Sequence, residues 1–258
     1  MNSTAPLSAA PTAPSFPARA AMLAYGVLCY AIGLSGLMWL ILTCLGIVPQ
    51  GLGLVETSSP TAGIALNLAL VGLFGVQHVI MARPAFKRRW TRLIPAAAER
   101  STFVVISGSL MALAMALWQP VAGSVWSLES PAAVWAVRVV GGLGWTYMLL
   151  ASFAINHFEL FGLSQVWNYF RGHQPRPLPL VARFMYRFDR HPIMTGILLG
   201  LWGTPSMDTT RFLLAAFFTG YMILGVLIEE GTLVQVHGEA YREYRRRVAA
   251  LVPFPGRR

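Results

Sequence analysis

Six apolar segments recur along this chain of 258 residues and leave little room for any other kind of structure. Five of them are long enough, at about 18 residues or more, to cross a lipid bilayer as a helix. They cover about 21–48, 62–81, 101–118, 132–155 and 210–228, and the sixth, 193–202, is short for a full crossing. We therefore predict an all-α integral membrane protein, a helical bundle of five to six transmembrane segments.

The composition favours a membrane protein over a soluble domain. Charged residues make up 12% of the chain, about half the fraction of a typical soluble domain. The net charge of +10 does not indicate a nucleic-acid partner, because the basic residues lie in short segments between the apolar ones. Cys29 and Cys44 both fall in the first apolar segment, which favours packing over a disulfide. The histidines show no metal-ligand spacing, so we predict no bound metal.

The basic residues also predict the topology. Seventeen of the twenty Lys and Arg residues lie in 83–100, 171–190 and 242–258, and the loops at 49–61, 119–131 and 204–209 contain none. Positive loops stay on the cytoplasmic side, so we expect these three segments and both termini in the cytoplasm of a cell inner membrane. Six crossings then follow, with the short fifth segment and the sixth forming a hairpin.

The remaining segments predict a tail and two surface helices. Residues 1–17 carry no charge and are rich in Ala, Pro and Ser, which predicts a disordered N-terminal tail before a single membrane domain at 18–258. The run after Arg19 is too long for a signal-peptide core, so the first helix is expected to be uncleaved. Residues 156–171 have the aromatic anchors of an interfacial helix, and the basic segment after 228 is expected to form a cytoplasmic helix.

Polar residues at membrane depth are rare, so the few in this chain are the candidates for a site. All lie at the cytoplasmic ends of the predicted helices: Gln77, His78, Asn156, His157, Glu159, Asp189, His191, Glu229 and Glu230. Their convergence at one depth predicts a pocket. Glu229 and Glu230 are expected to close the last membrane helix, where carboxylates oppose the helix dipole, so a cation should lie beside them.

Simpler interpretations of the same residues stay open. In the simpler interpretation, His78 and His157 are helix-end residues that form hydrogen bonds to the backbone or to lipid headgroups. His191-Pro192 is also a normal helix start, with proline in the first turn. The arginines of 242–247 also suit a membrane-surface helix that binds anionic lipid.

Four motifs in the last third of the chain resemble the isoprenylcysteine carboxyl methyltransferase superfamily, whose members are S-adenosylmethionine-dependent membrane enzymes. They are Arg-His-Pro-x-x-x-Gly at 190–196, Glu-Glu-x-x-Leu at 229–233, His-Gly-x-x-Tyr-x-x-Tyr at 237–244 and a contracted Val-Pro-Phe-Pro ending at 252–255. Upstream, residues 77–84, 99–102 and 156–167 are similar to the branch that methylates methanethiol. NnrU-like membrane proteins share part of this pattern.

The resemblance implies S-adenosyl-L-methionine as cofactor, bound mainly by 156–258. It implies methylation of a small thiol, methanethiol to dimethyl sulfide, at the cytoplasmic face. The residues that it assigns to the cofactor are Gln165, Arg190, His191, Pro192, Met194, Gly196, Glu229, Glu230, Tyr241, Tyr244 and Arg245. Gly196 is expected to let the ligand approach closely.

The acceptor side of the site is predicted from the polar residues near the membrane surface. A thiol reacts as the thiolate, so a base within hydrogen-bond reach is expected. His157 is the first candidate, because a histidine at this depth titrates near neutral pH, and His78 and Asp189 follow. Gln77, Asn156, Phe161 and Trp167 are expected to contact the substrate.

Three alternatives to a small thiol substrate remain open. The first is a lipid or prenylated acceptor. The turn before the paired glutamates, 225–228, is wholly apolar and lacks the arginine of many carboxyl-methylating relatives, which favours an acceptor without a carboxylate. The second is an NADPH-dependent enzyme similar to the membrane sterol reductases. The third is a non-enzymatic membrane protein of the NnrU kind.

Overall fold

The computed structural model describes residues 14–173 and 180–251, and within them the fold is an all-α membrane bundle. Five helices are long and apolar enough to cross a bilayer: α1 (Phe16–Cys44), α2 (Pro60–Ala82), α4 (Ala96–Leu117), α5 (Pro131–Ile155) and α9 (Thr209–His237). Helix α8 (Pro192–Trp202) has 11 residues, too few to span a bilayer, which takes about 20. It forms an antiparallel hairpin with α9, which confirms that part of the sequence prediction.

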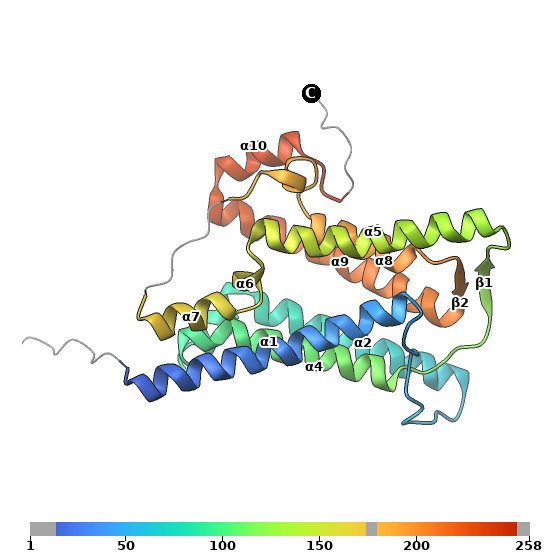
Figure 1. Cartoon of the computed structure of the whole chain (residues 1–258), viewed down its shortest axis with the longest axis horizontal. Coiled ribbons are helices and arrows are strands. Elements are labelled where there is room, and N and C mark those ends of the chain that lie inside the picture. The colour runs from blue at the N-terminus through green and yellow to red at the C-terminus, as the bar shows by residue number, and fades with distance from the viewer. Residues whose placement is uncertain (1–13, 174–179, 252–258) are drawn as a thin grey trace, which may run out of the picture.

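Short elements lie at the two ends of the bundle (Figure 1). At one end are α6 (His157–Leu160), α7 (Leu163–Arg171), the 3₁₀ helix η1 (Phe184–Arg187) and α10 (Glu239–Arg247). Helix α3 (Pro84–Trp90) follows α2 at this same end. At the other end, β1 (Ser124–Ser127) pairs antiparallel with β2 (Ser206–Asp208). The described parts of the three basic segments therefore share one end of the molecule, which we call the polar end.

The helices pack in two groups, with glycine at the closest contacts. Helix α1 lies along α4, and a Cβ added to Gly36 would overlap the carbonyl oxygen of Gly108. Helix α8 lies along α5, where a Cβ added to Gly141 would overlap the carbonyl oxygen of Gly203. Because side chains are absent there, the backbones approach closely and gain dispersion contacts in place of a hydrophobic driving force.

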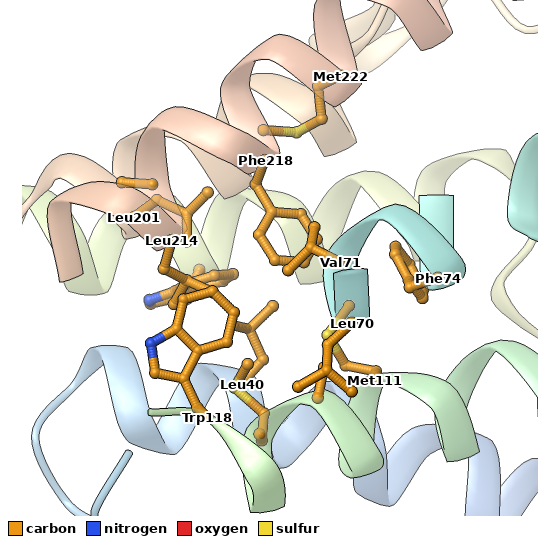
Figure 2. Close-up of a cluster of buried hydrophobic side chains, with 14 of the residues drawn as sticks. Leu40, Leu70, Val71, Phe74, Met111, Trp118, Leu201, Leu214, Phe218 and Met222 are labelled. Carbon is orange, nitrogen blue, oxygen red and sulfur yellow. The ribbon is translucent and has the colours of Figure 1, made fainter. Parts of the chain in front are cut away.

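One apolar core joins the two groups (Figure 2). It contains residues from α1, α2, α4, α5, α8 and α9. The labelled members are Leu40, Leu70, Val71, Phe74, Met111, Trp118, Leu201, Leu214, Phe218 and Met222. They lie in the middle of the bundle and in the half nearest β1 and β2. The seam between the two groups is therefore filled by apolar side chains in this region.

The strand end is held by a single arginine that sequence reasoning did not single out. Arg211, in the first turn of α9, donates from Nη2 to the carbonyl oxygens of Thr43 (2.6 Å) and Cys44 (2.8 Å). These carbonyls end α1 and have no partner inside their own helix. Arg211 thus satisfies the C-terminus of α1 from the other helix group.

Three predicted boundaries were wrong. Helix α1 begins at Phe16, so the last two residues of the predicted 1–17 tail are helical, and residues 1–13 lie outside the described part. The predicted interfacial helix 156–171 is two helices, broken where Gly162 adopts a φ of +89° against Ser101. Helix α9 continues to His237 instead of ending near 228, because loss of hydropathy does not end a helix. Glu229 and Glu230 therefore lie inside α9 and do not oppose its C-terminal dipole.

We expect two adjacent glycines of α5 to respond differently to alanine. Gly141→Ala places a methyl group against the Gly203 carbonyl and should destabilise the protein by about 1–3 kcal/mol through overpacking. Gly142→Ala is the matched control, because nothing lies within 4 Å of its added Cβ. Thermal unfolding of the detergent-purified variants measures both. Equal melting temperatures for the two variants would contradict the close α5–α8 contact.

Candidate functional site

A buried ion pair joins α9 to the start of α8 at the polar end. Arg190 donates from Nε (2.7 Å) and Nη2 (2.5 Å) to Oε1 of Glu230. The two side chains are only 9% and 12% exposed. Nη1 of Arg190 donates to the carbonyl oxygens of Arg245 and Val248, which belong to the C-terminal segment. The cation expected beside the paired glutamates is thus Arg190, and its donors are used to hold three chain segments together.

Asp189 shapes the start of α8 rather than facing a ligand. Its side chain is fully buried, and Oδ1 accepts a hydrogen bond from the backbone N–H of His191 at 3.0 Å. Residues 189–191 also pair in parallel with 249–250, where Arg190 N donates to Ala249 O at 2.9 Å. Burial raises the pKa of Asp189 above its usual range. The second carboxylate oxygen, Oδ2, is buried without a hydrogen-bond partner among the described residues, so the role of Asp189 as a base stays a prediction.

Glu229 forms the open side of the same cluster, and the buried His191 faces it. Nδ1 of His191 lies 3.7 Å from Oε2 of Glu229, and Nε2 lies 3.4 Å from Oε1 of Glu230. The Glu229 side chain is 49% exposed, in contrast to its neighbour. Of the two glutamates, Glu229 therefore keeps a carboxylate that a ligand can approach.

The two tyrosines of α10 pack inward. Tyr241 and Tyr244 are buried, with ring centroids 5.8 Å apart, and the Tyr244 hydroxyl donates to Tyr186 O at 2.5 Å. Burial raises the pKa of Tyr241 to about 12. Arg245 is 52% exposed, and its Nη1 lies 3.7 Å from Oε2 of Glu230. Tyr244 thereby anchors α10 to the 184–190 segment, whereas the Tyr241 hydroxyl is buried without a hydrogen-bond partner among the described residues.

A cavity of about 290 Å³ opens at the polar end between α3, α4 and the α5–α7 connection. It is lined by Lys87, Glu99, Arg100, Ile155, Asn156, Glu159, Leu160 and Gln165. Gln165 donates from Nε2 to Oε1 of Glu159 at 3.0 Å, and its own Oε1 is buried without a hydrogen-bond partner among the described residues. Asn156, with a φ of +131°, caps α6 by accepting from Glu159 N at 3.2 Å.

Arg100 is one of several residues lining this cavity that the predicted site omitted. It lies in the second turn of α4, where Nε donates to Leu160 O at 2.6 Å. Its guanidinium carbon lies 4.9 Å from the centroid of the Phe103 ring. In the sequence it belongs to a basic segment that indicates topology, so composition alone gives no reason to select it. Only the return of α6 to α4 marks it as a site residue.

His157 occupies a closed environment, contrary to its predicted role as the first candidate base. Nδ1 lies 2.9 Å from the Ser152 hydroxyl and Nε2 lies 2.9 Å from the Tyr30 hydroxyl. The buried ring stacks on Phe153 with centroids 4.4 Å apart. Burial lowers the pKa of His157. Both nitrogens are bonded to protein, so His157 joins α1 to the end of α5.

His78 is the histidine with an unsatisfied atom. Its Nδ1 is buried and has no hydrogen-bond partner in the described part of the chain. Its ring lies 4.7 Å from that of Phe103 and 6.1 Å from that of Tyr221. These neighbours belong to α4 and α9, so His78 lies in the seam between the two helix groups. His78 and Arg100 contact the same ring, Phe103.

The remaining predicted residues divide between packing and surface. Gln77 accepts from the Ser107 hydroxyl at 3.2 Å, and Phe161 packs on His157 with ring centroids 4.7 Å apart. Trp167 is 48% exposed beside Arg171, so its predicted substrate contact is not supported.

The start of α8 is likewise packed. Pro192 is buried and Met194 packs on the apolar core. A Cβ added to Gly196 would meet Met148 N at 2.5 Å, so the argument that Gly196 admits a ligand was wrong: it admits α5. In the described residues, no three His, Cys, Asp or Glu side chains are grouped as metal ligands would be.

Comparison with known proteins gives several relatives of nearly the full length. A methanethiol S-methyltransferase of Crocosphaera subtropica is 36% identical over 253 residues, which are 95% of this chain and 96% of that protein. One from Mycobacterium tuberculosis is 38% identical over 228 residues, 88% of this chain and 90% of that protein. Nurim of Rattus norvegicus is 29% identical over 74% of this chain and 76% of its own length. No family model and no solved structure matches the chain.

Removing Arg190 should release the C-terminal segment. Arg190→Ala leaves Glu230 buried without its cation, a change that costs about 3 kcal/mol when a buried pair is broken. We expect faster hydrogen–deuterium exchange over 239–251 and a lower melting temperature. Arg245→Ala is the matched control, because this exposed arginine at 3.7 Å contributes at most about 1 kcal/mol. Unchanged exchange in Arg190→Ala would show that the ion pair does not hold the segment.

Proposed function

The chain belongs to the family of methanethiol S-methyltransferases, and from that premise we propose that it methylates methanethiol to dimethyl sulfide, using S-adenosyl-L-methionine as the methyl donor. The observation that carries the proposal is similarity to these enzymes over 95% of the chain. The likeness therefore includes the helices before residue 156 as well as the motifs of the last third. Those earlier helices supply the residues that line the acceptor side of the seam.

The residues at the polar end suit the methyl donor. An ammonium or sulfonium group needs nearby carboxylates, and Glu229 presents one that is half exposed beside His191. Gln165 adds a buried acceptor without a partner among the described residues, Oε1. We assign Glu229, His191 and Gln165 to the donor. Arg190, Glu230, Tyr241 and Tyr244 support this site by holding the C-terminal segment against α9.

Bound S-adenosyl-L-methionine supplies a methyl group on a positively charged sulfur. Methanethiol loses its proton, and its sulfur lone pair forms the new C–S bond as the old bond's electrons return to the donor sulfur. The products are dimethyl sulfide, S-adenosylhomocysteine and one proton. Opposite charges cancel in this step, so a site shielded from water favours it, and alignment of the two reactants provides much of the acceleration.

His78 is the proton acceptor in this proposal. Its buried Nδ1 has no partner among the described residues, and it lies where α2, α4 and α9 meet. His157, in contrast, would have to give up a hydrogen bond to Ser152 or Tyr30 before accepting a proton. A proton taken up by His78 is passed to solvent at the polar end.

The polar end belongs at the cytoplasmic face of the inner membrane in this proposal, with both termini in the cytoplasm. The distribution of Lys and Arg supports this orientation. A water-soluble methyl donor is available there. A small apolar thiol is soluble in the bilayer and reaches the seam between the helices from the lipid.

A direct assay tests the function. Purified protein with S-adenosyl-L-methionine and methanethiol should release dimethyl sulfide into the headspace, measured by gas chromatography against heat-killed protein. Parallel reactions with prenylcysteine, and with NADPH and a sterol, test the alternative acceptors and the reductase reaction. No dimethyl sulfide above the heat-killed control rejects the proposal.

Replacing the two histidines should separate proton transfer from packing. His78→Gln should lower kcat by about 100-fold or more near neutral pH, as expected on loss of a general base. The deficit should shrink at higher pH, because more thiol ionises in solution. His157→Gln should lower the melting temperature, while the folded fraction keeps the wild-type pH profile. The reverse pattern, with the pH dependence changed only in His157→Gln, would overturn the assignment.

A further inference from the structure

We propose that Arg100 binds the thiolate form of the acceptor and is a catalytic residue of this protein. This inference rests on the proposed function and extends it to the residue that stabilises the nucleophile. Arg100 and Gln165 line the same cavity, and the inference assigns its Arg100 side to a small anion with a sulfur atom. Gln165 and the Glu229 cluster remain assigned to the methyl donor.

Arg100 has donors available. Its Nε is bonded to Leu160 O at 2.6 Å, which fixes the orientation of the guanidinium plane. In the described part of the chain, its two Nη atoms make no hydrogen bond and no ion pair, and the side chain lines the 290 Å³ cavity. Arginine cannot be deprotonated in a protein, so the cation persists at every working pH. A partly buried cation with free donors is an anion site.

The neighbouring charges leave Arg100 free to act. Three carboxylates, those of Glu99, Glu159 and Glu229, lie close enough to Arg100 to interact with its charge. Each has another partner: Glu99 lies 3.6 Å from Lys87 Nζ, Glu159 accepts from Gln165, and Glu229 faces His191. Among the described residues, Arg100 is therefore surrounded by carboxylates but not paired directly with any of them, and its donors remain for a fourth anion.

The position of Arg100 also matches the proton acceptor. Arg100 and His78 contact one ring, Phe103, with separations of 4.9 Å and 4.7 Å from its centroid. The thiolate that remains after the thiol has lost its proton keeps its negative charge beside the guanidinium. Simple thiols ionise well above neutral pH, so an enzyme that works near neutral pH gains most from a cation that stabilises the thiolate.

The dependence of the rate on thiol acidity tests the proposal. Arg100→Gln should lower kcat/KM for methanethiol by about 100-fold, comparable to the loss of one anion-stabilising donor. With 2,2,2-trifluoroethanethiol, which ionises at lower pH, the loss should be less than about 10-fold, because this thiol needs less help from a cation. The loss for methanethiol should also diminish as the pH rises. The variant alters only Arg100 and keeps the titratable and charged residues near it, which are His78, Lys87, Glu99, Glu159 and Glu229.

Two controls distinguish thiolate binding from cofactor binding and from a folding defect. S-adenosylhomocysteine should bind Arg100→Gln with a Kd within about threefold of wild type, measured by calorimetry. Arg92→Gln removes an exposed cation from the loop before α4 and should behave as wild type. If Arg100→Gln fails to fold, Arg100→Lys keeps the charge without the planar fork. It should retain more activity toward acidic than toward weakly acidic thiols.

Three results have distinct meanings. Wild-type protein that releases no dimethyl sulfide rejects the proposed function itself. If wild type is active but Arg100→Gln or Arg100→Lys loses the same factor in kcat/KM for every thiol, the thiolate assignment is overturned. The proposed function then still stands. Weaker binding of S-adenosylhomocysteine, by about 10-fold or more, instead assigns Arg100 to the cofactor carboxylate and also overturns the thiolate assignment.

Discussion

The buried ion pair between Arg190 and Glu230 is the interaction on which the polar end depends. A charge enclosed in a membrane protein is costly unless it is paired and hydrogen-bonded, and both conditions are met here. Arg190 also donates to two carbonyl oxygens of the C-terminal segment. One side chain therefore links the start of α8, the C-terminal half of α9 and the chain that follows α10. The positions of the buried His191 and of the half-exposed Glu229 follow from this link.

The two helix groups carry different kinds of polar residues, although Gln165, which we assign to the donor, lies on α7. One group, α5, α8 and α9, carries the Glu229–His191 cluster that suits a cation. The other, α1, α2 and α4 with α7, carries His78 and Arg100, which suit a thiol and its anion. Phe74, Phe218 and Met222 fill the seam between the two groups where the apolar core lies. Glycine contacts within each group make the arrangement rigid without placing side chains in the seam.

The helices could be predicted well from the sequence because each prediction rests on the hydropathy and charge of many residues together. No single side chain determines whether a segment is a membrane helix. The sequence predicted the α8–α9 hairpin for the same reason. Individual site residues were harder. His157 and His78 have similar sequence settings, yet Tyr30, from 127 positions earlier, satisfies one of them and nothing described satisfies Nδ1 of the other. Gly196 was assigned to the cofactor by the family resemblance, and its contact with Met148 of α5 cannot be known from local pattern. Arg100 was overlooked because its neighbours come from α6 and α9.

The packed seam also bears on the size of the acceptor. Beyond His78 the space between the helix groups is occupied by Phe74, Phe218 and Met222, with Tyr221 beside them. A prenyl chain that enters along this path would have to displace several buried side chains at once, at a cost of a few kcal/mol for each. A one-carbon thiol is far smaller than a prenyl chain. The apolar turn at 225–228 adds no cation for an acceptor carboxylate. Selection of a small thiol can therefore arise from the same core that holds the two groups together, with no separate specificity element.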